Sequence, residues 1–137
     1  MNALPVSCDS SVLIAALSPW HPAYSECIAA LDRVTAIPAH ALLETYSVMT
    51  RMPKTQGVDP QHAAAVLTDQ PWAVLQLPPE RYEPLIHLFA EAGRGGGAIY
   101  DAQIAATTKY HGLVLLTRDR RAARTYELVD AAYELIG

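Results

Sequence analysis

The sequence predicts a single three-layer α/β/α domain with a short, mostly parallel central sheet. Short apolar runs, each long enough for one strand, alternate along the chain with longer segments of helical periodicity. Strands separated by helices need crossover connections, which make the paired strands parallel and place helices on the faces of the sheet. The 137 residues, 51% of them hydrophobic, have the size and composition of one globular domain spanning residues 1–137.

Five apolar runs are expected to form the strands, at residues 4–8, 34–37, 73–77, 113–116 and 133–136. Helices are expected at residues 11–17, 23–31, 39–51, 60–68, 79–92, 98–110 and 120–126. Pro38 suits the start of the third of these helices. The glycine-rich stretch 93–97 is too short to separate domains and is typical of a mobile loop.

Net charge and composition do not decide whether the partner is a nucleic acid. A net charge of −4 argues against nucleic acid, but charge is a weak indicator where its distribution is uneven. Four arginines surround the single acid Asp119 near the C-terminus, namely Arg118, Arg120, Arg121 and Arg124. The two cysteines, Cys8 and Cys27, lack metal-ligand spacing, and Cys8 lies in an apolar run that predicts a reduced, buried thiol.

Nothing in the chain predicts secretion or membrane insertion. The first six residues have neither the basic region nor the sustained apolar core of a signal peptide. No stretch approaches the roughly 20 apolar residues that a membrane helix needs. We therefore expect a cytoplasmic protein with no membrane partner.

Three acids stand where a strand ends or a helix begins. Asp9 directly follows the first strand and Asp119 comes three residues after the fourth, and the carboxyl ends of parallel strands meet at one edge of a sheet. Asp101 lies in the first turn of helix 98–110, where the helix dipole favours its ionised form. Helix capping alone explains Asp9 or Asp119 about as well as a functional role does. Capping does not explain why several acids are expected close together.

Glu44 is the weakest of the candidate acids when taken alone. Helical periodicity predicts that Leu42, Tyr46 and Met49 share one face of helix 39–51, with Glu44 and His40 on the opposite face. A solvated polar face is the more common explanation for a helical glutamate, and the wall of a groove is the alternative. We exclude His40 and the other histidines from the site, because a lone histidine is more often a surface or capping residue.

Four segments, in their order along the chain, resemble PIN-domain nucleases and more narrowly the VapC-type toxins of bacterial toxin–antitoxin pairs. The resemblance covers nearly the whole chain, and four weak motifs in register are more specific than any one of them. The segments are Asp9-Ser10-Ser11-Val12-Leu13-Ile14, Leu43-Glu44, Tyr100-Asp101-Ala102-Gln103-Ile104-Ala105-Ala106 and Leu115-Leu116-Thr117-Arg118-Asp119.

The resemblance implies a magnesium-dependent endoribonuclease that acts on RNA, with Mn²⁺ able to replace Mg²⁺. It implies a cognate antitoxin protein as partner and a homodimer. It also implies that the cation is held by four acids, Asp9, Glu44, Asp101 and Asp119. Many relatives carry a further acid where this chain has Ala122, so one outer ligand is missing.

Other residues are expected to position the substrate. Ser11 and Thr117 would place hydroxyls near the pocket, and Arg118 would contact the RNA. The arginine cluster and Lys54 are the candidates for contacts to the phosphate backbone, which Lys and Arg make without reading sequence. Solvated helix faces explain these cations about equally well.

Three other functions compete with that of a nuclease. A phosphatase that forms an aspartyl-phosphate needs a second Asp two residues after Asp9, where this chain has Ser11. A receiver domain needs paired acids early in the chain, which are absent here. The strongest alternative is a PIN-like domain that binds RNA or protein without cutting, although all four acids are retained.

Overall fold

The fold is built on short parallel strands that end at one common edge. The computed structural model describes residues 4–53 and 57–137. Within these residues the strands are Val6–Cys8 (β1), Ala36–Pro38 (β2), Ala73–Leu75 (β3), Val114–Thr117 (β4) and Tyr133–Leu135 (β5). All pairings are parallel, with β4 between β1 and β5 and with β2 beside β3. One parallel bridge from Val6 to Val34 brings the two sheets together and confirms the expected α/β topology.

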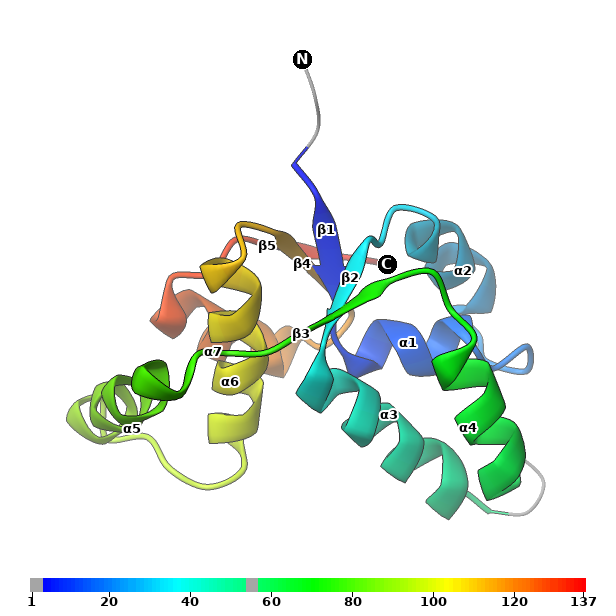
Figure 1. Cartoon of the computed structure of the whole chain (residues 1–137), viewed down its shortest axis with the longest axis horizontal. Coiled ribbons are helices and arrows are strands. Elements are labelled where there is room, and N and C mark those ends of the chain that lie inside the picture. The colour runs from blue at the N-terminus through cyan, green and yellow to red at the C-terminus, as the bar shows by residue number, and fades with distance from the viewer. Residues whose placement is uncertain (1–3, 54–56) are drawn as a thin grey trace.

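Helices flank the strands on both sides, as expected for three layers. In Figure 1, α5, α6 and α7 lie in the left half of the molecule, below β4 and β5, and α1, α3 and α4 lie in the right half. The helices are Ser10–Ala16 (α1), Tyr24–Leu31 (α2), Ala39–Arg51 (α3), Pro60–Thr68 (α4), Tyr82–Glu91 (α5), Ala98–Tyr110 (α6) and Arg120–Val129 (α7), with a 3₁₀ turn at Pro79–Arg81 (η1).

The predicted element boundaries are close to the observed ones, with two informative differences. The helix expected at 79–92 divides into η1 and α5. The last helix runs to Val129 rather than residue 126, and it ends where Asp130 adopts a left-handed conformation with φ of 62°. Asparagine and aspartate are among the few non-glycine residues that adopt this conformation readily.

The strands nearest the site are the most deeply buried. Leu115, Leu116 and Thr117 of β4 and Cys8 of β1 have no exposed surface, because helices cover both faces of the parallel sheet. Cys8 and Cys27 are both free and buried, as predicted for Cys8. This packing fixes the carboxyl ends of β1 and β4.

The predicted face of α3 is partly wrong. Its fully or nearly buried residues are Ala41, Thr45 and Met49, while Tyr46 is 39% exposed. The helix packs against both α1 and α4, and these contacts favour small residues on the inner face. Glu44 is consequently half-buried at the margin of the packed face, rather than opposite to it.

Across residues 4–53 and 57–137, the helices are too short or too polar for any of them to cross a membrane.

Candidate active site

Asp9 and Asp119 meet at the sheet edge because their strands are neighbours. The backbone N–H of Asp9 donates to the carbonyl of Leu116 at 3.1 Å, which extends the β1–β4 pairing to the site. Asp9 caps α1, accepting from the N–H groups of Ser11 at 3.0 Å and of Val12 at 3.4 Å. Asp119 caps α7 in the same way. Both capping interpretations are therefore confirmed, and they place the two carboxylates at one edge.

Asp9 is the centre of a buried hydrogen-bond network. The side chain is only 3% exposed. Its Oδ1 also accepts from the hydroxyl of Ser11, and its Oδ2 accepts from the hydroxyls of Thr117 and Tyr126, the last at 2.6 Å. The structure thus places the predicted residues Ser11 and Thr117 against this carboxylate. Burial raises the pKa of Asp9, while the hydrogen bonds from the three hydroxyls act in the opposite direction.

Tyr126 is a site residue that the sequence reasoning missed. It lies on the buried face of α7, seven residues after Asp119, where two helical turns return a side chain to nearly the same face. Burial and the adjacent carboxylate of Asp9 raise its pKa, so the phenol stays protonated and acts as a donor. The amphipathic pattern of residues 120–129, with Ala122, Tyr126 and Val129 on one face, would have indicated that Tyr126 points inward.

Asp101 and Glu44 complete the acidic cluster. The pKa of Asp101 is raised to about 6, first by burial and then by the charges of Glu44, Asp119 and Asp9. Each of the other three predicted acids therefore lies close enough to Asp101 for its charge to act on this carboxyl. Glu44 accepts a hydrogen bond from the hydroxyl of Ser10, which links α3 to the start of α1.

A hollow of about 440 Å³ opens beside Asp101 and Asp119. It also holds Arg121, whose charge lowers the pKa of Asp101, and Arg94, which donates to Thr125 Oγ1 at 2.8 Å. Two guanidinium groups beside two carboxylates can hold a phosphate next to an acidic centre. The lining residues are Arg94, Gly97, Ala98, Asp101, Asp119, Arg121, Ala122 and Thr125.

The remaining predicted cations either do not line this hollow or lie outside the described residues. The N–H of Arg118 donates to Ser11 Oγ at 2.8 Å, and the Arg118 charge contributes to lowering the pKa of His21, after burial. Its buried Nε has no hydrogen-bond partner among the residues described. Arg120 and Arg124 are exposed on α7. Lys54 lies outside the described residues.

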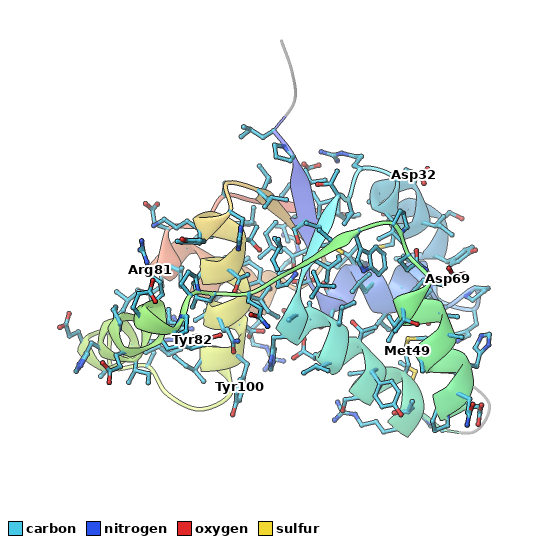
Figure 2. All side chains as sticks on the ribbon, in the orientation of Figure 1. Asp32, Met49, Asp69, Arg81, Tyr82 and Tyr100 are labelled. Carbon is cyan, nitrogen blue, oxygen red and sulfur yellow. The ribbon has the colours of Figure 1, made fainter. Side chains whose placement is uncertain are left out.

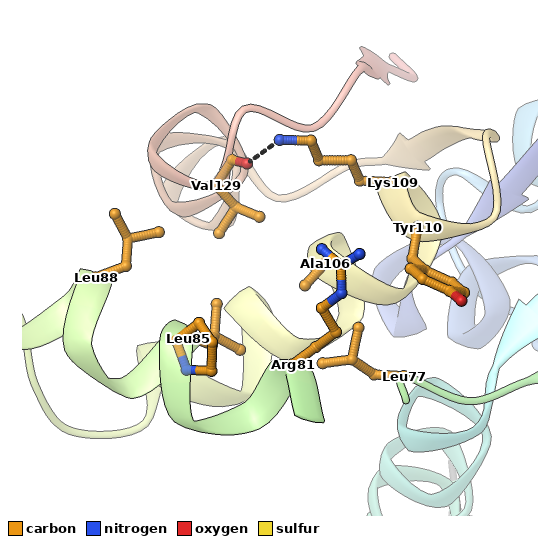
Figure 3. A pocket seen from close by; sticks show the side chains of 9 residues that line it. Leu77, Arg81, Leu85, Leu88, Ala106, Lys109, Tyr110 and Val129 are labelled. Carbon is orange, nitrogen blue, oxygen red and sulfur yellow. Dashed lines mark hydrogen bonds between the residues drawn. The ribbon is translucent and has the colours of Figure 1, made fainter. Parts of the chain in front are cut away.

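The larger cavity of about 540 Å³ lies at the far end of α6, away from the acids (Figure 3). Its two cations are already engaged, because Lys109 donates to the carbonyl of Val129 at 3.2 Å and Arg81 lies 5.3 Å from the ring centre of Tyr110. Leu77, Leu85 and other apolar side chains form the rest of its wall. The acidic edge is consequently the better candidate for chemistry.

The donor chemistry of the acidic cluster fits a hard divalent cation. Carboxylate oxygens are the ligands that Mg²⁺ prefers, and a cation would relieve the repulsion that, after burial, raises the pKa of Asp101. Within the described ranges, no three His, Cys, Asp or Glu side chains are grouped closely enough to hold an ion together. Magnesium usually binds through one or two carboxylates and several waters, so direct contact with all four acids is not required.

The raised pKa of Asp101 predicts a pH-dependent stability of the metal-free protein. Because the pKa is about 6 in the folded chain and 3.8 for an unperturbed aspartate, the folded state binds more protons between these values. The stabilisation from that proton is lost as pH rises through about 6. In EDTA, Asp101→Asn should therefore unfold at a higher temperature than the unsubstituted protein at about pH 7.5, and the difference should narrow toward about pH 5. If the difference in unfolding temperature did not change with pH, the raised pKa of Asp101 would be contradicted.

Comparison with known proteins matches the same span of the chain. Residues 6–128 match the PIN domain family. Ribonuclease VapC40 of Mycobacterium tuberculosis is 40% identical over 129 residues, which cover 93% of this chain and 96% of that protein. Ribonuclease VapC27 of the same species is 40% identical over 126 residues, which cover 91% and 92%.

Solved structures share the fold at low sequence identity. Mycobacterium tuberculosis VapC20, described as a sarcin-ricin loop cleaving toxin, has a TM-score of 0.69 and 15% identity over 87% of this chain and 93% of its own. VapBC2 from Rickettsia felis, crystallised with a DNA fragment from the promoter, has a TM-score of 0.68 and 15% identity over 96% and 98%. By family match, by relatives at 40% identity and by fold, the chain belongs to the PIN-domain family and, within it, to the VapC group.

Proposed function

We propose that this protein is a magnesium-dependent endoribonuclease. Its site for hydrolysing RNA phosphodiesters is formed by Asp9, Glu44, Asp101 and Asp119. The observation that carries the proposal is the sheet edge where Asp9 and Asp119 follow the paired strands β1 and β4, with Asp101 beside Asp119 in the adjoining hollow. Burial, and then the charges of Glu44, Asp119 and Asp9, raise the pKa of Asp101, which supports a shared acidic site. The names of the two relatives at 40% identity, both ribonucleases, support RNA as the substrate.

The residues of the chain divide the work of the reaction between them. Asp101 and Asp119 would bind the cation from α6 and α7, and Asp9 would do so from a position fixed by three hydroxyl donors. Bound magnesium would supply a water of lowered pKa and neutralise charge on the phosphate. Arg94 and Arg121, on the wall of the adjacent hollow, would orient the phosphate from the side. No side chain is required to act as a covalent nucleophile.

Cleavage of total cellular RNA tests this function directly. We expect the purified protein to cut RNA in Mg²⁺ or Mn²⁺ and to lose this activity in EDTA, with recovery when the metal is restored. Unchanged cleavage in EDTA would contradict the metal site. Binding of RNA with no cleavage of any fraction, in either metal, would instead favour the non-catalytic PIN-like domain.

Family membership also supports a proposal for the partners of the nuclease. We place the protein in the cytoplasm with a cognate antitoxin, as the toxin of a toxin–antitoxin pair, and we expect a homodimer. The structure of VapBC2, bound to a DNA fragment from its promoter, supports an antitoxin partner. Co-purification with the product of a neighbouring reading frame, and inhibition of cleavage by that product, would test the assignment.

A further inference from the structure

An aromatic pair, of which Tyr100 is exposed and His40 is partly buried, flanks the acidic cluster. The rings of His40 on α3 and Tyr100 on α6 lie parallel, with centroids 5.2 Å apart and planes within 7°. Tyr100 is 53% exposed, and Figure 2 shows it at the lower end of α6, projecting beyond the ribbon. The fold therefore leaves a stacked aromatic surface open to solvent.

The pair is tied to the site through its position on the two helices. Tyr100 directly precedes Asp101, and His40 lies one helical turn before Glu44, since residues four apart share a face. The stack therefore spans the same two helices, α3 and α6, that carry two of the four acids. Its distance from the acids along each helix is about one turn or less.

A cavity of about 330 Å³ continues from His40 along α6. Gln103 and Thr107 follow Tyr100 at three- and seven-residue spacing, which places all three side chains along one stripe of the helix. Gln103 donates to the hydroxyl of Tyr82 at 3.3 Å, so an amide and a phenol stand on the cavity wall. Leu43 forms another part of the wall and is 70% exposed.

This combination of groups fits an unstacked nucleobase. Bases splayed out of single-stranded RNA stack on Tyr and His rings, and amide groups such as that of Gln103 bond to base edges. A carboxylate-rich centre repels phosphate, so an aromatic surface beside it favours the base rather than the backbone. The cations that would hold the phosphate, Arg94 and Arg121, line a different hollow, one that includes Asp101.

We propose that His40 and Tyr100 form a stacking platform for one RNA base next to the scissile phosphate, with Gln103 and Tyr82 reading its edge. The inference rests on the proposed function for the reaction, but the binding itself does not require cleavage. In this arrangement Asp101 stands between the base on one side and the phosphate contacts on the other.

The test is a binding measurement that does not depend on catalysis. Fluorescently labelled single-stranded RNA of mixed sequence is titrated in EDTA with the unsubstituted protein, Tyr100→Leu and Tyr100→Phe. We expect Tyr100→Leu to weaken binding about tenfold and Tyr100→Phe to change it less than about twofold, because the ring rather than the hydroxyl stacks. Tyr110→Leu is the matched control, since Tyr110 is a 49% exposed tyrosine at the opposite end of the same helix.

A second measurement identifies the base. Substrates with one abasic position each, spanning the cleavage site found in total RNA, are cut by the protein and by Tyr100→Leu. One position is expected to raise KM about tenfold for the unsubstituted protein and to have little further effect in the variant. If the unsubstituted protein and Tyr100→Leu bound RNA with equal affinity and cut it with equal KM, the stacking platform would be wrong and the nuclease would stand. The His40–Tyr100 pair would then be a candidate contact for a protein partner. Binding through Tyr100 without any cleavage would support the platform and contradict the nuclease, and neither binding nor cleavage would overturn both.

Discussion

Asp101→Asn is expected to lower the rate of RNA cleavage at least about a thousandfold, since loss of a metal ligand removes several kcal/mol of transition-state stabilisation and each 1.36 kcal/mol is tenfold. Asparagine has the same shape but no charge to hold the cation. Burial and then the charges of Glu44, Asp119 and Asp9 raise the pKa of Asp101, which is the environment that a bound cation would neutralise. Initial rates in saturating Mg²⁺, with the cleavage products separated on a gel, measure the effect.

The matched control for this variant is Asp69→Asn. Asp69 is an exposed aspartate that ends α4, far along the chain from the acidic edge and visible at the right of Figure 2. It should leave the cleavage rate within about twofold, as surface substitutions away from a site usually have small effects. If Asp101→Asn retained more than about a tenth of the activity, the catalytic role of Asp101 would be wrong.

Much of the fold could be predicted because local pattern and tertiary structure agree in this chain. The apolar runs at β1 and β4 are buried on both faces, so the sequence signal and the final environment coincide. Asp9 and Asp119 were predictable as caps for the same reason, since a strand ends and a helix begins at each. Parallel topology then brought both to one edge without further information.

The features that escaped prediction depend on contacts between distant segments. Tyr126 meets Asp9 across 117 positions of sequence, and Ser10 meets Glu44 across 34. The predicted inner face of α3 was right for Met49 and wrong for Tyr46, because the face that packs against α1 and α4 also includes Ala41 and Thr45 and leaves Tyr46 exposed. Apolar periodicity alone ranks a tyrosine above an alanine for the core, whereas close packing of helices reverses that order.

Asp9→Ala is expected to destabilise the protein by about 3 kcal/mol as well as to abolish cleavage. The helix cap contributes about 1 kcal/mol, and each buried hydroxyl left without its acceptor costs about 1–3 kcal/mol. Thr117 and Tyr126 both donate to Asp9 Oδ2 in the buried network. Removal of a buried carboxylate, whose pKa burial raises, offsets part of this loss. Urea unfolding in EDTA at neutral pH measures it without any contribution from bound metal.

Asp59→Ala separates the buried network from simple capping. Asp59 caps α4 through one 3.3 Å bond from the N–H of His62 and is exposed, so its loss should cost about 1 kcal/mol or less. An equal cost for Asp9→Ala would show that the hydroxyl network adds nothing to stability. In EDTA at neutral pH, Asp101→Asn should stabilise the chain and Asp9→Ala should destabilise it, although both variants are expected to lose most of the cleavage activity. These opposite changes in stability would show that Asp101 serves the site through its charge, whereas Asp9 also stabilises the edge of the sheet.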